Sequence, residues 1–340
     1  MPPSLDPAGV TRHIPPLSRG DHVETKVFDA SGKRIWVAGH RGMVGAAVVR
    51  RLSTAGCEVL TVGREEVDLT RQADVERWLD RSRPDAIVMA AARVGGIHAN
   101  STLPADFLFV NLMIGANVVN AAHRAGVKRL VNLGSSCMYP VGAPQPIAEA
   151  SIGDGRPEPT NEAYAVAKLA TASLAATYRK QYGADYITVI PTNLYGPGDN
   201  FDPMMSHVAP ALMRRMIEAR NAHLAKVEIW GSGKPRRELM FVDDAADAIA
   251  FVLERYSAAE PINIGIGVDV SIRELADLIG KTVGYKGELA FDASKPDGAP
   301  RRLLDNSRLA ALGWKASTPL ADGLDAMYRW YCKHKLDVAA

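Results

Sequence analysis

The apolar positions of the chain alternate between two spacings from residue 33 to residue 192. Short continuous apolar runs, such as "KRIWVAG" and "DAIVMAAA", are typical of strands buried on both faces of a parallel sheet. Longer segments between them have apolar residues every three or four positions, the spacing of an amphipathic helix. Strands are predicted at residues 33–39, 57–62, 85–92, 129–135 and 185–192, and helices at 42–55, 74–82, 104–126 and 161–182. This alternation predicts an α/β fold with a doubly wound parallel sheet.

The pattern changes after about residue 192. Glycine- and proline-rich loops become frequent, and short strands are predicted near residues 227–230, 239–242, 261–264 and 288–292. We therefore expect residues 33–192 to form one domain and residues 193–335 to form mainly a smaller C-terminal α/β lobe that holds a substrate. Residues 239–256 are a candidate for returning to the first domain. Residues 1–32 have five prolines in their first sixteen positions and few large apolar groups, which predicts a flexible tail.

The overall composition excludes several classes of protein. The chain has 340 residues, 47% of them hydrophobic, and 40 basic against 38 acidic side chains give a formal net charge of +2. These values are typical of a globular protein and give no reason to expect a nucleic-acid or membrane partner. The three cysteines have no CxxC spacing, so neither a metal site nor a disulfide framework is predicted. No apolar run approaches the roughly 20 residues of a membrane span, and no secretory signal is present, so a cytoplasmic location is expected.

A glycine-rich segment follows the first predicted strand. Its glycines have the spacing G-x-x-G-x-x-G and precede the first predicted helix. Glycine permits a tight turn and lets the backbone approach a pyrophosphate, whose charge is favoured by the free N–H groups at a helix N-terminus. The strand before and the helix after supply the context of a Rossmann-type dinucleotide site. The candidate cofactor contacts are Gly39, His40, Arg41, Gly42, Met43, Val44 and Gly45.

The end of the second predicted strand indicates which dinucleotide would bind. An acid that holds the ribose of NAD is expected there, about 20 residues after the glycine motif. The sequence has Arg64 in this place, after Val62 and Gly63. A guanidinium pairs with a 2′-phosphate in two-point geometry, and Arg41 is a second candidate partner. NADP(H) is therefore favoured over NAD(H), the alternative being that Arg64 is a solvated loop charge.

A tyrosine and a lysine lie one turn apart in the helix predicted at 161–182. Tyr164 and Lys168 share one face of this helix. A nearby ammonium stabilises a phenolate and lowers the pKa of the phenol, which suits acid–base catalysis at neutral pH. Ser135, after the fourth strand, would complete the set by a hydrogen bond to a substrate carbonyl. Such a spacing is often structural, but its place after a Rossmann half and a strand-end serine favours a catalytic role.

Two further side chains are candidates for proton transfer. Cys137 lies two residues after Ser135 in the same strand-end loop, where a thiol can take and give a proton, although most free cysteines are buried spacers. His207 ends the long loop that leaves the fifth strand at Pro191. Alone it is typical of a helix start, but facing the same cleft as Cys137 it would be a second proton-transfer group.

A further set of residues fits a nucleotide. The segment "WGSGKPRRE" combines an aromatic ring, glycine turns and three positive charges. Arginines suit a pyrophosphate, and an aromatic ring suits a flat base. The candidate residues are Arg215, Trp230, Arg237 and Asp297. Each of them, taken singly, is also consistent with a solvated charge or a core tryptophan.

Several segments resemble one known family closely. The segments are "AGHRGMVG", "AAARVGGIHAN", "NLGSSCMYP", "EPTNEAYAVAKLA", "PTNLYGPGDNF", "WGSGKPRRE" and "FDASKPDGAPRRLLD". They resemble the GDP-L-fucose synthases, which are extended short-chain dehydrogenase/reductases. The resemblance runs from about residue 33 to residue 335, and the Ser-Ser-Cys run and "KPDG" are its most selective parts. One departure is Gly198, in a loop where some relatives have histidine, and it affects no predicted role.

The resemblance implies an activity and a set of roles. The family converts GDP-4-keto-6-deoxy-D-mannose and NADPH to GDP-L-fucose by epimerising C3 and C5 and then reducing C4. Ser135, Tyr164 and Lys168 would act on the C4 oxygen, and Cys137 and His207 would be the epimerisation base and acid. The implied NADPH contacts beyond the glycine segment are Arg64, Leu133, Lys168, Pro191, Thr192, Asn193, Leu194 and His207. The implied GDP-sugar contacts are Ser135, Ser136, Cys137, Asn193, Arg215, Trp230, Arg237 and Asp297.

Two alternative functions are compatible with parts of this pattern. A nucleotide-sugar 4-epimerase or dehydratase would keep NAD bound and show no net oxidation. A non-catalytic NADPH-binding sensor predicts a broken Tyr–Lys pair or a missing serine, and all three residues are intact. The resemblance also implies that the helices at 104–126 and 161–182, each apolar on more than one face, form a four-helix bundle between two subunits. A homodimer is therefore expected.

Overall fold

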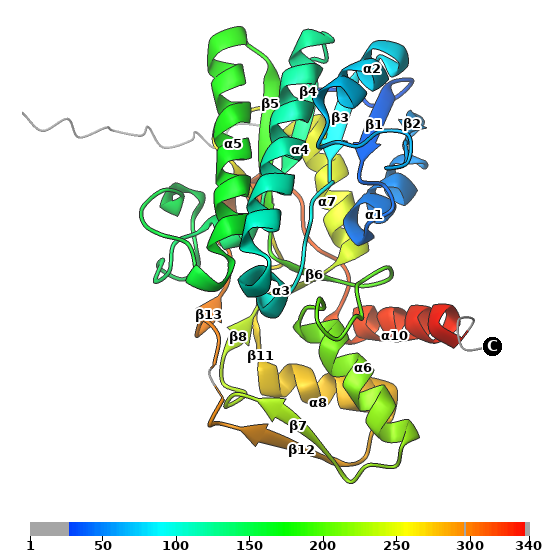
Figure 1. The fold of residues 1–340 in the computed structure, drawn as a ribbon, viewed down its shortest axis with the longest axis vertical. Coiled ribbons are helices and arrows are strands. Elements are labelled where there is room, and N and C mark those ends of the chain that lie inside the picture. Colours follow the sequence, from blue (N-terminus) through cyan, green and yellow to red (C-terminus); the bar gives the residue numbers. More distant parts are fainter. Residues whose placement is uncertain (1–26, 296, 337–340) are drawn as a thin grey trace, which may run out of the picture.

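The central feature of the computed structural model, which describes residues 27–295 and 297–336, is a six-stranded sheet (Figure 1). The strand order is β10-β5-β4-β3-β1-β2, and all neighbouring strands are parallel. The strands are β1 (Arg34–Ala38), β2 (Glu58–Leu60), β3 (Ala86–Met89), β4 (Arg129–Leu133), β5 (Asp185–Pro191) and β10 (Ile262–Ile264). The prediction of a doubly wound parallel sheet is confirmed.

Helices cover both faces of this sheet, which explains why its strands are mainly apolar on both faces. In β1, Ile35 and Val37 point into one buried cluster, and Trp36 and Ala38 point into the cluster on the opposite face. The first cluster includes α1 (Met43–Leu52) and α7 (Val242–Arg255). The second includes α2 (Gln72–Ser82), α4 (Pro104–Arg124) and α5 (Glu162–Tyr182).

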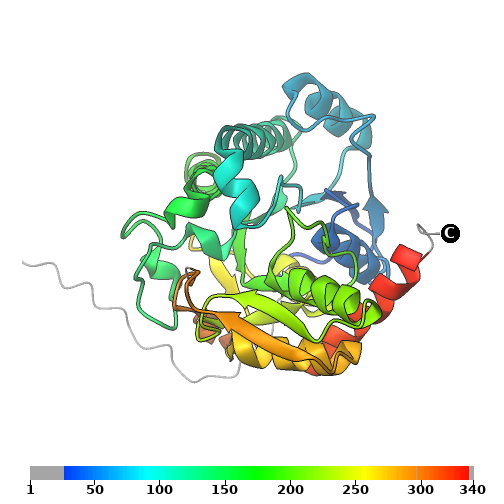
Figure 2. The same cartoon turned by 60° about the horizontal axis from the view of Figure 1, so that its bottom comes forward.

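A smaller lobe lies below the carboxyl ends of the strands in Figure 1, and Figure 2 shows it from its outer side. Its core is formed by α6 (Val208–Asn221), α8 (Ile272–Val283), α10 (Leu320–Leu336) and the parallel strands β7 (Lys226–Trp230) and β12 (Glu288–Asp292). A three-stranded sheet joins β11 (Val270–Ser271), β8 (Arg236–Arg237) and β13 (Arg301–Arg302). The pair β6 (Asn193–Tyr195) and β9 (Leu239–Phe241) leads from one lobe to the other.

Short elements that the sequence pattern did not predict surround the site. They are α3 (Ile97–Thr102), α9 (Ser307–Ala311) and the 3-10 turns η1 (Ser136–Met138), η2 (Glu149–Ser151) and η3 (Pro159–Asn161). None of them is long enough to show a helical period in the sequence. Two of them, η1 and η3, carry residues that lie beside the candidate catalytic groups.

The C-terminal half is more interleaved with the first domain than the apolar pattern indicated. The strand predicted near residues 261–264 is β10, which pairs with β5 at the edge of the main sheet rather than belonging to the small lobe. α7 packs against α1 in the core of the main sheet. We propose that residues 242–264 be assigned to the cofactor domain, because their apolar side chains complete its core.

The expected tail is wrong for residues 27–32. The backbone N–H groups of Val27 and Phe28 donate to the carbonyl oxygen of Glu254, at 2.8 and 3.2 Å. Ala30 is 2% exposed and belongs to the core beside α7. This short segment therefore packs against the end of α7. The remaining residues of the expected tail, 1–26, lie outside the described residues.

One helix forms where it was predicted but meets a length and composition test for a membrane span, which the sequence pattern did not indicate. In the described part of the chain, α4 is the one helix that is long and apolar enough to cross a membrane by those two measures alone. It packs against α5 and α2, and Phe107, Val118 and Ala122 on it are fully buried in the protein. A core helix between a sheet and a second helix meets the same composition test.

A buried arginine at the start of β4 fixes the main sheet to the end of α7. Arg129 is 1% exposed and donates to the carbonyl oxygens of Val252, Leu253 and Tyr256 while pairing with Asp185 at 2.5 Å. Replacing Arg129 with methionine should lower the free energy of unfolding by about 3–5 kcal/mol, because three buried acceptors and a carboxylate lose their donor. Urea denaturation would measure this.

A matched control for that prediction is Arg124→Met. Arg124 is 61% exposed and pairs with Glu76 on the surface, so its loss should cost at most about 1 kcal/mol. Equal midpoints for the two variants would contradict a structural role for the buried guanidinium.

Candidate active site

The turn between β1 and α1 forms a cradle for an anion. Gly39 has φ +86°, and a Cβ on it would lie 2.6 Å from the Cα of Ala91. A Cβ on Gly45 would overlap the carbonyl oxygen of Gly39. Gly42 stands before the first turn of α1, which has neither a side-chain cap nor an acidic residue. The free N–H groups of this helix end therefore suit a pyrophosphate, so the glycine segment fits the predicted cofactor.

This cradle lies where ligands bind in open α/β sheets. The strand order places β1 between β2 and β3, so the chain direction across the sheet reverses beside β1. The chain passes from β1 to β2 on one side and from β3 to β4 on the other. This divergence opens a crevice outside the carboxyl ends of β1 and β3. Gly198, in the loop after β6, also approaches it, since a Cβ there would lie 3.5 Å from the Cα of Met43.

The structure distinguishes the two arginines proposed for a 2′-phosphate. Arg41 forms a two-point ion pair with Glu65, at 2.8 and 2.5 Å. Arg64 is 81% exposed, and its ion pair with Asp68 is long, at 3.9 Å. Sequence reasoning did not use Glu65, although it directly follows Arg64. Arg41 neutralises this carboxylate, which leaves Arg64 as the guanidinium that an added phosphate can recruit.

The predicted serine, tyrosine and lysine lie together at the end of β4. Lys168 is 7% exposed and its Nζ donates to the carbonyl oxygen of Leu133 at 2.7 Å. Burial lowers the pKa of Lys168 to about 8. Its Nζ lies 5.9 Å from the centre of the Tyr164 ring, and the Tyr164 hydroxyl is hydrogen-bonded to Ser135.

The net effect on Tyr164 is the reverse of the one expected from the Tyr–Lys spacing. Burial raises the pKa of the Tyr164 phenol, the neighbouring Cys137 adds to the rise, and the hydrogen bond with Ser135 opposes it. Desolvation of the phenolate therefore outweighs stabilisation by nearby donors. A phenol that keeps its proton is an acid that can donate to a developing oxyanion.

Cys137 is held in the same cluster by hydrogen bonds at its backbone and its sulfur. Its backbone N–H donates to Ser135 Oγ at 3.2 Å in the turn η1. Its Sγ accepts from Asn161 Nδ2, also at 3.2 Å. The neighbouring Ser136 is 4% exposed, and its carbonyl oxygen accepts from Arg302 Nη1 at 3.1 Å. Arg302 thus ties the small lobe to the strand-end loop.

His207 precedes α6, at the end of a loop whose Met205 lies close to Gly95. A Cβ on Gly95 would lie 3.1 Å from the Phe107 ring and 3.2 Å from Met205, so the loop before His207 packs next to Phe107. The Phe107 ring meets the Tyr164 ring edge-on, with centroids 6.5 Å apart. Burial lowers the pKa of the His207 imidazole. Among the hydrogen bonds of the described residues, none joins His207 to Cys137.

The small lobe brings positive charge towards the same edge. β8 pairs with β13, and the register of this pair puts Arg237 opposite Arg302. Burial lowers the pKa of Arg237, Arg302 lowers it further, and Asp297 opposes both. Two adjacent, partly desolvated guanidinium groups favour an anion between them. Arg237 also donates to the carbonyl oxygen of Ala299 at 2.7 Å, which fixes its position.

The other predicted nucleotide contacts lie around the end of β7. Trp230 is 67% exposed, and Lys295 Nζ lies 5.6 Å from the centre of its ring. Asp297 accepts hydrogen bonds from the backbone N–H and the hydroxyl of Ser232, at 2.9 and 2.7 Å. Arg215, on α6, donates to the carbonyl oxygen of Glu228. An exposed ring is available to stack on a base.

Comparison with known proteins identifies the family. Residues 35–265 match the model of the NAD dependent epimerase/dehydratase family. A GDP-L-fucose synthase of Sinorhizobium fredii is 51% identical over 90% of this chain and 98% of its own length. GDP-L-fucose synthase 1 of Arabidopsis thaliana is 53% identical over 91% of this chain and 96% of its own length. The chain belongs to the GDP-L-fucose synthases of the NAD dependent epimerase/dehydratase family.

A solved structure of the family agrees with the fold. A GDP-L-fucose synthetase of Naegleria fowleri, bound to NADP, is 26% identical and has a TM-score of 0.84. The alignment covers 92% of this chain and 98% of that one. The extended short-chain dehydrogenase/reductase resemblance deduced from the motifs is therefore confirmed over both lobes.

Four candidate family contacts lie where the main chain crosses between the lobes. Pro191 ends β5, and the backbone N–H of Thr192 donates to the carbonyl oxygen of Ile264 at 2.9 Å. Asn193 Nδ2 donates to the carbonyl oxygen of Glu238 at 3.1 Å. Leu194 packs against the main core.

Sequence reasoning missed Glu238, which organises this crossing. It is fully buried, and its carboxylate accepts from the backbone N–H groups of Ile266, Gly267 and Leu304 at 2.6, 2.7 and 3.0 Å. The signal was weak because an acid in "PRRELMF" resembles a surface charge. Only the folded chain brings those three N–H groups to one point.

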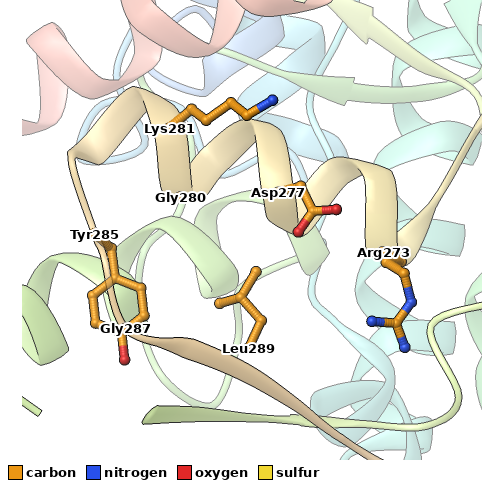
Figure 3. A pocket seen from close by; sticks show the side chains of 7 residues that line it. All are labelled: Arg273, Asp277, Gly280, Lys281, Tyr285, Gly287 and Leu289. Carbon is orange, nitrogen blue, oxygen red and sulfur yellow. The ribbon is translucent and has the colours of Figure 1, made fainter. Parts of the chain in front are cut away.

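A cavity elsewhere on the small lobe has a different character. It measures about 510 Å³ and is lined by α8 and the turn that follows it (Figure 3). The side chains of Arg273, Lys281 and Tyr285 point in different directions in Figure 3. Arg273 stacks on Phe291 at 3.8 Å, and the Tyr285 hydroxyl donates to the carbonyl oxygen of Leu224. Arg273 and Tyr285 are thus engaged within the small lobe, and the cavity contains none of the predicted catalytic residues.

Proposed function

We propose that the protein converts GDP-4-keto-6-deoxy-D-mannose to GDP-L-fucose by epimerisation at C3 and C5 and NADPH-dependent reduction at C4. The observation that carries this proposal is the placement of Cys137 beside the Ser135–Tyr164 pair. A reductase needs the serine, tyrosine and lysine, whereas a thiol in the same hydrogen-bonded loop adds a group that can move a carbon-bound proton. The high identity to GDP-L-fucose synthases over nearly the whole chain supports the same activity.

The first two steps use the acidity that a ketone gives to its neighbours. The C4 carbonyl acidifies the protons on C3 and C5, and removal of either proton forms an enolate whose charge rests on O4. Ser135 and Tyr164 would donate hydrogen bonds to this oxygen, which stabilises the enolate as an oxyanion site does. We propose Cys137 and His207 as the base and acid that invert both centres, one removing the carbon-bound proton and the other donating its own proton to the opposite face of the enolate.

The last step is assigned to the same residues. Bound NADPH supplies the hydride that reduces C4. Tyr164 would donate its proton to O4 as the charge develops there, and Lys168 would hold the cofactor ribose and keep positive charge near the phenol. The proton-retaining environment of Tyr164 suits this role.

The small lobe would hold the nucleotide. We propose that Arg237, with Arg302 beside it, binds the pyrophosphate, and that Trp230 stacks on the guanine ring. Arg215 and Asp297 would complete the pocket. Arg302 was absent from the predicted contacts, and its bond to the Ser136 carbonyl oxygen couples pyrophosphate binding to the catalytic loop.

A single assay tests the proposed function. Purified protein should oxidise NADPH, followed by absorbance at 340 nm, when GDP-4-keto-6-deoxy-D-mannose is added, and NMR should identify the product as GDP-L-fucose. A flat trace would contradict the proposal. A sugar product without net NADPH oxidation would favour a nucleotide-sugar 4-epimerase instead.

Arg64 is expected to distinguish the two nicotinamide cofactors. Arg64→Ala should raise the Kd for NADPH by about tenfold or more, the loss of one hydrogen-bonded charge pair, and leave the Kd for NADH unchanged. Fluorescence titration of both cofactors measures this. Arg71→Ala removes a similarly exposed arginine that pairs with Asp74 and serves as the control. Equal losses for NADPH and NADH would mean that Arg64 does not contact the phosphate.

We further propose that the protein is a cytoplasmic homodimer formed through α4 and α5. These helices pack against each other, and Phe109, Leu112 and Val166 on them are 62%, 38% and 42% exposed. Burying this apolar surface against a second copy would remove it from water. Sedimentation should give a dimer, and Phe109→Asp should give a monomer. Val268→Asp, at an exposed valine of the small lobe, is the control.

A further inference from the structure

Asn161 stands at the start of α5 but does not cap it. Asparagine is among the preferred residues at this position because its side chain can accept from the first backbone N–H groups of a helix. The side chain of Asn161 makes no such bond. Its Nδ2 instead donates to the sulfur of Cys137 at 3.2 Å, across the space between η3 and η1. The side chain of Asn161 is therefore used for a contact with another segment instead of for capping its own helix.

The other end of the same amide is buried and unsatisfied. Asn161 Oδ1 is inaccessible to solvent and has no hydrogen-bond partner among the described residues. Buried side-chain acceptors are normally paired, and an exception at a ligand site indicates an acceptor for the ligand. The amide thus has a donor engaged by the Cys137 sulfur and an acceptor left for a hydroxyl group.

We propose that Asn161 is a positioning residue that holds the Cys137 sulfur and accepts a hydrogen bond from a hydroxyl of the sugar ring. An N–H donated to sulfur stabilises the thiolate, the form that removes a proton, and fixes its direction. The same amide would then place the ring carbon of the substrate against that sulfur. The second half of this proposal rests on the proposed function, whereas the first half concerns the protein alone.

The first half is tested by alkylation of the full-length protein without substrate. Iodoacetamide labelling at pH 7, followed for each cysteine by mass spectrometry, should be about three- to tenfold slower at Cys137 in Asn161→Ala. It should be slower still in Asn161→Asp, which has the same shape but brings a carboxylate against the sulfur. Cys57, whose thiol donates to the Leu52 carbonyl oxygen, should react equally in all proteins. Thr160→Ala, in the same turn, is the control variant.

If Cys137 in Asn161→Asp reacts as fast as in the unmodified sequence, while Cys57 reports an intact fold, the amide does not act on the sulfur. Because labelling needs no sugar nucleotide, this outcome is independent of whether the protein makes GDP-L-fucose.

The second half is tested by steady-state kinetics. Asn161→Asp keeps an acceptor oxygen but loses the donor, whereas Asn161→Ala loses both. We expect exchange of the C3 and C5 protons with heavy water to fall in both variants, and KM for the sugar nucleotide to rise about tenfold only in Asn161→Ala. An equal KM in the two variants would contradict the proposed contact between Asn161 Oδ1 and the sugar hydroxyl.

Discussion

Replacing Tyr164 with phenylalanine is expected to slow C4 reduction by about 10³-fold, within the range for removing a positioned general acid. The phenol keeps its proton in its buried site, and phenylalanine has none to give to O4. Ser135 would still donate to the enolate, so exchange of the C3 and C5 protons should fall far less. Stopped-flow oxidation of NADPH and NMR of solvent exchange measure the two steps separately.

The control for this variant is a hydroxyl on the same helix. Tyr178 donates to Asn120 Oδ1 at 2.9 Å, away from the site, so Tyr178→Phe should leave both steps near their original rates. If Tyr164→Phe reduced the ketone at the original rate, another group would have to be the proton donor. Unchanged NADPH affinity in Tyr164→Phe would show that the lower rate comes from the reduction step and not from weaker cofactor binding.

Replacing Cys137 with serine is expected to slow C3 and C5 exchange by about 10²-fold or more, as for loss of a general base. A hydroxyl can take the place of the thiol and its hydrogen bond with Asn161, but it is far harder to ionise at neutral pH. The proposed reductive set of Ser135, Tyr164 and Lys168 stays complete. Residual NADPH oxidation should therefore give a product that retains the original configuration at C3 and C5.

Two other cysteines provide the comparison. Cys57 and Cys332 are also free thiols, and they lie outside the cluster. Cys57→Ser and Cys332→Ser should leave exchange and NADPH binding unchanged. Exchange at the original rate in Cys137→Ser would exclude the thiol from epimerisation and leave His207 as the candidate to examine next.

The sequence pattern determined the main sheet because its strands are local signals. The central strands are mainly apolar on both faces, as Ile35 and Trp36 illustrate by pointing into opposite clusters. In a soluble protein, such a run is typical of a parallel sheet that helices cover on both faces. The sequence pattern did not place β10 in the main sheet for the complementary reason: its short apolar segment has the same pattern wherever it pairs. Its place beside β5 depends on contacts distant in sequence.

The candidate site divides in the same way between local and tertiary information. Gly39, Ser135, Cys137, Tyr164 and Lys168 were identified because they sit at strand ends or share a helix face, which are properties of a single segment. Asn161, Glu65 and Arg302 were not identified, because their roles exist only through partners in other segments. The electrostatics also required the fold: burial of Tyr164 and Lys168 governs their pKa shifts, and burial is a property of the whole packed cluster.

The sequence by itself therefore determined the Rossmann-type architecture, the cofactor class and the residue types available for chemistry, because these depend on local periodicity and motif spacing. The tertiary structure decided that Arg41 neutralises Glu65 while Arg64 stays exposed, that Tyr164 retains its proton, and that Asn161 reaches the Cys137 sulfur. Each of these outcomes is set by distance and desolvation between segments far apart in the chain, and these follow from packing rather than from the order of residues.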